Sequence, residues 1–308
     1  MGRVDGNIDT LDLETRIVEK PFPKIHQGFL YSLSILTSSG ERLISSDYSG
    51  MIVLWDLKSK TALHKLEGHT STIPAIVPLP GQSAIVSGSH DGSIRIWDAE
   101  NGEQKSCFIP ADRSERTLHL KGRTYQETVS AMLVVIDGRI IAGGWSGVVR
   151  VWDSTTSKLL SSWQAHFDGP VIGTVINNIM LHPRKDVFIT TGTDGRVCLW
   201  DLATYSLLRT IKPLEHAVLP NAAAWNGTTF ICGGKDGGGA ANVCGAFNKI
   251  VTWDLAHTTL EDGVEDEFRQ LGSLCEYVPR VWSIGPVVVM IVQRRGKLTV
   301  EIWTEEVL

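Results

Sequence analysis

The chain has 308 residues, a formal net charge of −5 and a pI of about 6.0. This length suits one large domain, over residues 1–308, with an ample core, and the acidic balance gives no overall basic footprint for nucleic acid. The apolar runs are too short to span a bilayer, the first residues lack a secretory signal, and the five cysteines show no paired spacing. We therefore expect a protein of the cytoplasm or nucleus with reduced thiols.

A repeat runs through the sequence. Trp-Asp occurs at residues 55, 97, 152, 200 and 253, and Trp303-Thr304 continues the series in weakened form. The spacing of roughly 40 to 55 residues is typical of repeat architectures, in which each unit is one supersecondary element. Six units are therefore expected to end at these positions.

The first residues match the end of such a unit. Residues 5–12 align with residues 91–98 position by position, with Leu11 in place of Trp97. The alignment predicts a part-unit that ends near residue 11, with a further extended segment over residues 16–20. Two interpretations stay open, because this segment either completes the last of six units or belongs to an incomplete array of seven.

The unit at residues 66–98 shows the local pattern most clearly. Residues 84–87 predict a buried strand, and residues 94–97 alternate apolar with polar side chains as a strand does. Between them, Asp91-Gly92 supplies the positive φ angles of a tight hairpin turn. Short strands separated by turns at this spacing indicate an all-β, closed or radial architecture. First strands are expected at residues 73–77, 129–134 and 175–180 of their units.

These residues resemble the WD-repeat β-propeller family, which pairs Gly-His near the start of each repeat with Trp-Asp near its end. Here Gly68-His69 and Trp97-Asp98 carry the pattern, and the resemblance covers residues from about 4 to 303. It implies four-stranded antiparallel blades, six of them full and one an N-terminal part-blade. The repeat ends lie near residues 11, 55, 97, 152, 200, 253 and 303. The resemblance also implies a scaffold or adaptor that binds other proteins.

The family further implies a buried hydrogen-bond network in each strong blade, joining a His, a Ser or Thr, an Asp and the Trp. The matching residues are His69, Ser87, Asp91 and Trp97; His166, Thr190, Asp194 and Trp200; and a partial set of His216, Asp236 and Trp253, with Cys232 at the hydroxyl position. His26 and His119 lie at comparable places. A buried carboxylate is tolerated only when it is paired, so we expect structural roles and no metal site here.

The expected Asp is absent from three units. Ser49 stands six residues before Trp55, and Ser146 stands six before Trp152, where Ala142 also replaces the hydroxyl; the last unit has Lys297 at that position. We expect these blades to depend on packing and to lack the network.

Partner contacts are expected on the top face, at the residue before each turn Asp, where the family makes frequent contacts. These residues are Tyr48, His90, Trp145, Thr193 and Lys235. Trp145 is the most telling, because aromatic anchors dominate interface energetics. The equal alternative is that Trp145 folds back onto its own blade as packing.

Two long connections fall on the same face. The connection at 110–127 is basic, and the Gly/Ala-rich insertion at 237–247 suggests flexible filler. With His90 and Trp145, the basic connection predicts a sector that receives an acidic or phosphorylated peptide, although a solvated linker is the plain alternative. The basic residues are Arg113, Arg116, Lys121 and Arg123.

Motifs for catalysis are missing from the sequence, which has no phosphate-binding loop, zinc-protease helix or nucleophile elbow. We expect no enzyme activity, cofactor or small-molecule substrate. Two alternatives to the scaffold stay open. One is a substrate receptor of a cullin-type ubiquitin ligase, although no unit fully matches the docking signature that ends Trp-Asp-x-Arg/Lys. The other is binding of nucleic acid or phospholipid through the 110–127 loop, which salt would weaken steeply.

Overall fold

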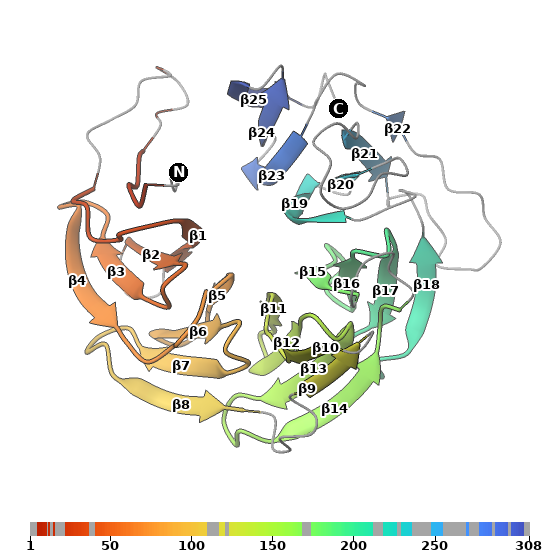
Figure 1. Ribbon diagram of the computed structural model, residues 1–308, viewed down its shortest axis with the longest axis horizontal. Helices are drawn as coiled ribbons and strands as arrows, with labels where there is room; N and C mark the ends of the chain where they lie inside the picture. Colours follow the sequence, from red (N-terminus) through yellow and green to blue (C-terminus); the bar gives the residue numbers. More distant parts are fainter. Residues whose placement is uncertain are drawn as a thin grey trace. The chain divides into compact units, whose positions relative to one another are not determined.

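The computed structural model describes residues 5–10, 12, 15, 22–36, 41–109, 117–120, 123–167 and 174–211, and strands between residues 218 and 304 (Figure 1). For β9, β10 and the strands beyond residue 217 it describes the backbone, together with the side chain of Phe230. The chain forms two compact units, residues 1–163 and 164–308, and each is considered by itself. Within the described residues, no helix is long and apolar enough to cross a membrane.

The first unit contains three four-stranded antiparallel sheets, blades 1 to 3, whose strands follow one another in chain order and are called a to d. Blade 1 comprises β1 (Leu30–Leu36), β2 (Arg42–Asp47), β3 (Ile52–Asp56) and β4 (Thr61–Leu66). Blade 2 comprises β5 (Ala75–Pro78), β6 (Ala84–Gly88), β7 (Ile94–Asp98) and β8 (Gln104–Phe108). Blade 3 comprises β11 (Ala131–Val134), β12 (Arg139–Gly143), β13 (Val148–Asp153) and β14 (Leu159–Gln164).

The core of the first unit lies between successive blades. Strands b are buried on both faces, since all five residues of β6 are buried, whereas the outer strand β4 alternates between exposed and partly buried residues. One apolar cluster joins Ile44 of blade 1 to Ile85 and Trp97 of blade 2, and the next joins Val86 of blade 2 to Trp152 of blade 3. Each of these tryptophans therefore packs in the core, as its place in the repeat requires.

In blades 1 and 2, the turn between strands b and c lies close against the next blade. Gly50 and Gly92 have φ angles of +93° and +83°. A Cβ atom on Gly50 would lie 2.6 Å from the carbonyl oxygen of His69, and one on Gly92 would lie 2.8 Å from that of Glu127. Both the left-handed backbone and the close approach therefore require glycine.

Residues 5–10 take up the corresponding position beside blade 1. Gly6 has a φ of +84°, and a Cβ atom there would collide with the carbonyl oxygen of His26. Among the described residues of this segment Ile8 forms a bridge, in which its carbonyl oxygen accepts the N–H of Phe22 at 3.1 Å. Ile8 and Phe22 pack against Trp55. The second segment, predicted over residues 16–20, lies outside the described residues.

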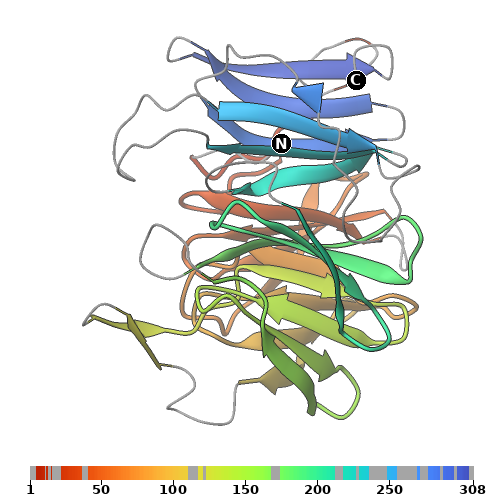
Figure 2. The ribbon, with the colours of Figure 1, turned by 90° about the vertical axis from the view of Figure 1, so that its right-hand side faces the viewer.

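A hairpin occurs where the sequence predicted an irregular connection. β9 (Thr117–Leu120) and β10 (Arg123–Gln126) pair with each other alone, Leu120 opposite Arg123. Figure 2 shows this olive-coloured hairpin away from the four-stranded sheets. The run at residues 117–120 alternates polar with apolar residues, and the two residues that follow it include Gly122, which favours a tight hairpin.

The second unit contains blades 4 to 6, of which the last has three strands in the described part of the chain. Blade 4 comprises β15 (Ile176–Leu181), β16 (Val187–Gly192), β17 (Val197–Asp201) and β18 (Leu207–Ile211). Blade 5 comprises β19 (Val218–Asn226), β20 (Thr229–Lys235), β21 (Asn248–Asp254) and β22 (Arg269–Gln270). Blade 6 comprises β23 (Tyr277–Ile284), β24 (Val287–Arg294) and β25 (Lys297–Thr304).

The six blades share one register. In each, the repeat Trp on strand c faces an apolar residue on strand b. The pairs are Trp55 with Leu43, Trp97 with Ile85, Trp152 with Ile140, Trp200 with Phe188, Trp253 with Phe230 and Trp303 with Val288. The sheets are therefore the antiparallel blades of an all-β propeller, one for each predicted Trp unit, and five of them have four strands in the described part of the chain.

Candidate functional site

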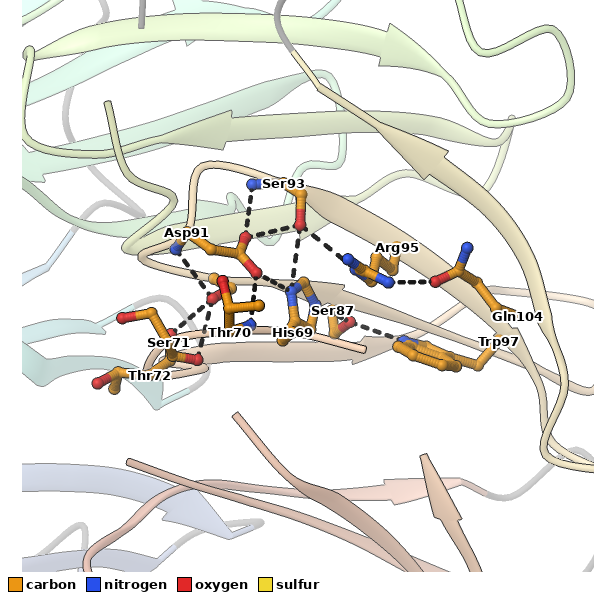
Figure 3. Close-up of polar contacts among 11 residues, drawn as sticks. His69, Thr70, Ser71, Thr72, Ser87, Asp91, Ser93, Arg95, Trp97 and Gln104 are labelled. Carbon is orange, nitrogen blue, oxygen red and sulfur yellow. Dashed lines mark hydrogen bonds and ion pairs between the residues drawn. The ribbon is translucent and has the colours of Figure 1, made fainter. Parts of the chain in front are cut away.

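Blade 2 contains a buried chain of four hydrogen-bonding side chains (Figure 3). Trp97 Nε1–H donates to Ser87 Oγ at 2.8 Å, and His69 Nε2 lies 2.8 Å from the same oxygen. His69 Nδ1 lies 2.9 Å from Asp91 Oδ2. The chain therefore links strand c, strand b, the loop that opens the blade and the b–c turn, and it contains the four residues that the sequence predicted.

Trp97 donates one proton to Ser87, and His69 joins Ser87 to Asp91 through its two ring nitrogens. Burial raises the pKa of the Asp91 carboxyl, but hydrogen bonds from His69 and Ser93 outweigh this effect and keep the pKa well below its ordinary value. Asp91 is therefore ionised at neutral pH. Its oxygens are occupied by the blade, which makes its role structural.

Blade 4 repeats the arrangement in the second unit. His166 Nδ1 lies 2.9 Å from Asp194 Oδ1, and His166 Nε2 lies 2.8 Å from Thr190 Oγ1. Trp200 Nε1–H donates to Thr190 Oγ1 at 2.9 Å. Thr190 therefore performs the part that Ser87 performs in blade 2, because either hydroxyl can accept from an indole and donate to an imidazole.

Blade 1 has the network that the sequence did not predict. His26 Nδ1 lies 2.8 Å from Asp47 Oδ2 and His26 Nε2 lies 2.6 Å from Ser45 Oγ, to which Trp55 Nε1–H donates at 2.7 Å. Asp47 stands eight residues before Trp55, and Ser49 occupies the expected place of the acid. Ser49 Oγ donates to Asp47 Oδ1 at 2.7 Å. The expectation that blade 1 lacks a network was therefore wrong.

Although Asp47 lies two residues earlier in the chain than the expected acid, the path of the turn places its carboxylate at the same position beside the histidine. Asp47 ends strand b, and its second oxygen accepts the backbone N–H groups of Ser49 and Met51 at 2.9 and 3.1 Å. Burial raises the pKa of the Asp47 carboxyl, but the hydrogen bonds from His26 and Ser49 lower it further, to below its ordinary value. A search for any Asp between strands b and c that follows an opening His would have found this residue.

Blade 3 has lost the network. Glu127 opens this blade at the place of His69 in blade 2, since its carbonyl oxygen meets the b–c turn glycine of the preceding blade just as that of His69 does. Ala142 and Ser146 replace the hydroxyl and the acid, as the sequence predicted. His119, which the sequence placed at the histidine position, lies in β9 instead.

The b–c turns of blades 1 and 2 are fixed to the segment before strand a of their own blade. Tyr48 N–H donates to the carbonyl of Phe29 at 3.0 Å, and His90 N–H donates to that of Thr72 at 2.8 Å. The predicted contact residues Tyr48 and His90 therefore occupy equivalent places on neighbouring blades.

Trp145 and Thr193 take the same position in blades 3 and 4 but differ in their partners. Trp145 N–H donates to Thr128 Oγ1 at 3.2 Å. Thr193 N–H donates to the carbonyl of Val175 at 3.0 Å, and its Oγ1 accepts the N–H of Val175 at 2.9 Å. The side chain of Thr193 therefore serves its own blade.

Aromatic side chains gather along these turns in the first unit. The ring of His90 lies 5.7 Å from that of Trp145 and 6.5 Å from that of Tyr31. Tyr48, Phe29 and Trp145 are 65%, 54% and 38% exposed. We call these five residues the aromatic rim. Trp145 thus packs toward blade 2, and does not fold back onto its own blade alone. Burial lowers the pKa of His90, which keeps its ring neutral at pH 7.

Several predicted site residues lie outside the described residues or have only their backbone described. The first group comprises Arg113, Arg116, Lys121, His216 and Asp236, with the insertion at 237–247. The second comprises Arg123 in β10, Cys232 and Lys235 in β20, and Trp253 in β21.

Neither a metal site nor a reactive thiol is indicated in the described part of the chain. No group of three or more His, Cys, Asp or Glu side chains there could bind a metal ion. Burial raises the pKa of Cys198 to about 12, so this thiol stays protonated and unreactive.

Comparison with known proteins agrees with the blades. The family described as WD domain, G-beta repeat matches residues 60–98, 115–153 and 157–201, and each match ends on the Asp of a Trp-Asp pair. The chain therefore contains WD repeats over these residues. The matches cover blades 2, 3 and 4, including blade 3, where the polar network is missing.

Relatives of this chain share about a quarter of its residues over the matched segments. It is 26% identical over 210 residues to Protein ROOT INITIATION DEFECTIVE 3 of Arabidopsis thaliana, covering 65% of this chain and 45% of that protein. It is 24% identical to Pre-mRNA-processing factor 19 of Oryza sativa subsp. japonica, covering 82% and 53%. It is 27% identical to Small ribosomal subunit protein RACK1y of the same rice, covering 56% and 47%. The chain therefore spans about half the length of these relatives.

Proposed function

We propose that this chain is a non-catalytic scaffold that binds a protein partner through the aromatic rim of its first unit. The observation that supports the proposal is the position of the His90 ring between those of Tyr31 and Trp145, which come from three successive blades, with Trp145 38% exposed. Exposed aromatic clusters of this kind are enriched at protein interfaces, because they supply large contact areas with little loss of side-chain entropy.

The electrostatics of the rim favour an apolar anchor from the partner. His90 lies at its centre and is neutral at pH 7, because burial lowers its pKa. A ring cluster without a formal charge gains most from burying apolar or aromatic side chains. The partner is therefore expected to contribute such a side chain at the contact with Trp145.

The backbone below the rim is already ordered for binding. The hydrogen bonds from Tyr48 to Phe29 and from His90 to Thr72 fix the two b–c turns on their blades. A surface that is fixed before it meets a partner loses less conformational entropy on association. This arrangement supports a role as a docking platform.

The names of relatives agree with a role inside assemblies. One is named a small ribosomal subunit protein, and another is named Guanine nucleotide-binding protein subunit beta, 28% identical over 142 residues. We propose that the present chain is likewise a subunit of a protein assembly, and that this assembly lies in the cytoplasm or nucleus.

An affinity capture from native lysate with quantitative mass spectrometry tests the proposal. The wild-type chain is compared with Trp145→Ala and Tyr48→Ala, and with Ile136→Ala as a matched control. Ile136 is 87% exposed and lies at the opposite end of β12 from Trp145, so its loss removes apolar surface away from the rim. We expect specific partners to be lost from both rim variants and retained by the control.

The outcome that contradicts the proposal is retention of the same partners by all variants, each shown to be folded. A further variant, Arg116→Glu, separates the rim from the basic connection. Loss of partners from Arg116→Glu alone would favour the acidic or phosphorylated peptide and would move the site away from the rim.

For the two alternatives, a ubiquitin-ligase receptor and a nucleic-acid or phospholipid binder, the described residues offer no specific supporting contact. In blade 2, Glu100 occupies the place where the ubiquitin-ligase docking signature requires a base, and its carboxylate accepts a hydrogen bond from Arg42 Nη2 at 2.9 Å. The residues proposed for nucleic acid or phospholipid are those of the basic connection, and binding that weakens steeply with salt would support that alternative.

A further inference from the structure

Blade 3 replaces three of the four network residues with side chains that cannot form the network. Glu127 occupies the position of the histidine, Ala142 that of the hydroxyl residue and Ser146 that of the acid. Trp152 is still buried in the core. The side chains of Ala and Glu occupy less space than those of Ser and His. The exchange therefore leaves room inside the blade.

A cavity of about 20 Å³ lies at this place. Its walls come from blade 3 and from the facing side of blade 2, and they include Glu127, Ala142, Arg150, Trp152, Ile94 and Phe108. A cavity needs roughly 10 to 15 Å³ on this measure to contain one water molecule. The space is therefore large enough for one water molecule, and its walls are both apolar and charged.

Two charged side chains meet in the cavity without satisfying each other. Glu127 is 3% exposed and Arg150 is 11% exposed, and Arg150 Nη1 lies 3.5 Å from Glu127 Oε2. Both carboxylate oxygens of Glu127 and the Nε of Arg150 are buried without a hydrogen bond from the described residues. Charge-assisted hydrogen bonds usually measure about 2.7 to 2.9 Å, and a buried charge that lacks them is strongly destabilising.

The chemistry of the walls selects the ligand. A cation would be repelled by Arg150 and an anion by Glu127, so the occupant is neutral. It must donate a hydrogen bond to the carboxylate and accept one from the guanidinium, and it must be as small as the cavity. Water meets all three requirements, since it donates two hydrogen bonds and accepts two.

We propose that the cavity in blade 3 binds an ordered water molecule that donates to Glu127 and accepts from Arg150 Nε. Solvent then completes in blade 3 the polar network that His, Ser or Thr and Asp complete in blades 1, 2 and 4. The site adjoins the aromatic rim, because Thr128 lines the cavity and accepts the backbone N–H of Trp145. The inference does not depend on the proposed function.

A crystal structure of the chain, at a resolution that places ordered water, tests the proposal directly. We expect a density peak about 2.6 to 3.2 Å from a Glu127 oxygen and from Arg150 Nε. Glu127 and Arg150 in direct contact below about 3.0 Å, with no peak between them, would overturn it.

Thermal unfolding supplies an independent readout. Arg150→Met leaves a buried carboxylate without its counter-charge, and we expect its Tm to fall by about 5 °C or more. The double variant Glu127→Leu/Arg150→Met removes both charges and should recover at least half of that loss. Arg139→Met is the control, because Arg139 pairs with the exposed Asp137 at the surface and such pairs contribute little. Equal Tm values for the single and double variants would mean that bulk solvent already hydrates Glu127, which overturns the proposal.

Discussion

At the scale of single residues, Asp47 shows that a network can survive when its acid moves along the chain. The acid stands two residues earlier than in blade 2, yet it reaches the same imidazole position and accepts from the same kind of donors. What the fold requires is a carboxylate at one point in space. The number of residues before the Trp matters only through the path of the turn.

Asp47, and not Ser49, should therefore determine the stability of blade 1. Replacing Asp47 with Ala leaves His26 and two turn N–H groups without their acceptor, and we expect a loss of about 2 to 3 kcal/mol in the free energy of unfolding. Ser49→Ala removes one hydrogen bond at a partly exposed site and should cost about 1 kcal/mol or less. Denaturant titration of both variants measures the difference. Equal losses would contradict the assignment.

The two acids with lowered pKa values also predict a pH dependence. Asp47 and Asp91 titrate below the ordinary value of 3.8 when the chain is folded. The unfolded chain then binds more protons than the folded chain as the pH falls, so their contribution is complete above about pH 4 and is lost below it. We expect stability to decline from about pH 4 downward.

The variant Asp47→Asn/Asp91→Asn isolates this effect from the other carboxyl groups. Its free energy of unfolding should be lower than that of the wild type at pH 7, and the gap should narrow as the pH falls toward 2, because protonation of the unfolded wild-type chain removes the stability that its carboxylates provide. Unfolding measured between pH 7 and 2 gives both curves. A constant gap across this range would show that the carboxylate charges are not involved.

At the scale of elements, the b–c turn sets how closely one blade packs against the next. Its glycine is fixed by two separate requirements, a left-handed backbone and the carbonyl oxygen of the next opening loop. The sequence predicted the first requirement from Asp91-Gly92. The second appears only when two blades lie side by side.

The pair Gly92→Ala and Gly81→Ala separates these two requirements. Both glycines have positive φ, +83° and +72°, but a Cβ atom on Gly81 meets nothing within 4 Å. Gly81→Ala should cost about 1 kcal/mol for backbone strain alone, whereas Gly92→Ala should cost about 2 to 3 kcal/mol or more because blade 3 must also move. Denaturant titration measures both losses. If they are the same, the contact between blades is not tight.

At the scale of the whole molecule, a repeat array distributes its stability over local units. Each blade contributes its own term and an interface with its neighbours. Blades 1, 2 and 4 have buried polar networks that tie the opening loop to the b–c turn, and blade 3 has a loose ion pair instead. Blade 3 is therefore expected to open more readily than its neighbour.

Hydrogen exchange with mass spectrometry checks this order. Amide protons of β12 and β13 should exchange about tenfold faster or more than those of β6 and β7 under native conditions, which corresponds to about 1.4 kcal/mol of local stability. Strands b and c are compared because they lie at the middle of their sheets in both blades. Protection that is equal in the two blades would show that apolar packing against Trp152 compensates for the missing network.

The sequence predicted the blades well, because their signals are local. Trp-Asp pairs, alternating strands and Asp-Gly turns each lie within a few residues, and all six Trp residues take the expected place on strand c. The networks of blades 2 and 4 were implied by the resemblance to the WD-repeat family. The hairpin of β9 and β10 was missed because its short alternation lies in a connection that carries no repeat signal.

The sequence by itself determined the class of fold and the number of Trp units, since these depend on short-range periodicity, and its resemblance to the WD-repeat family indicated the residues of the regular networks. Only the tertiary structure decided which acid serves His26, which residue replaces the histidine of blade 3 and which way Trp145 packs. These outcomes depend on where the turns of one blade meet the next. That geometry joins residues far apart in the chain, and no local pattern records it.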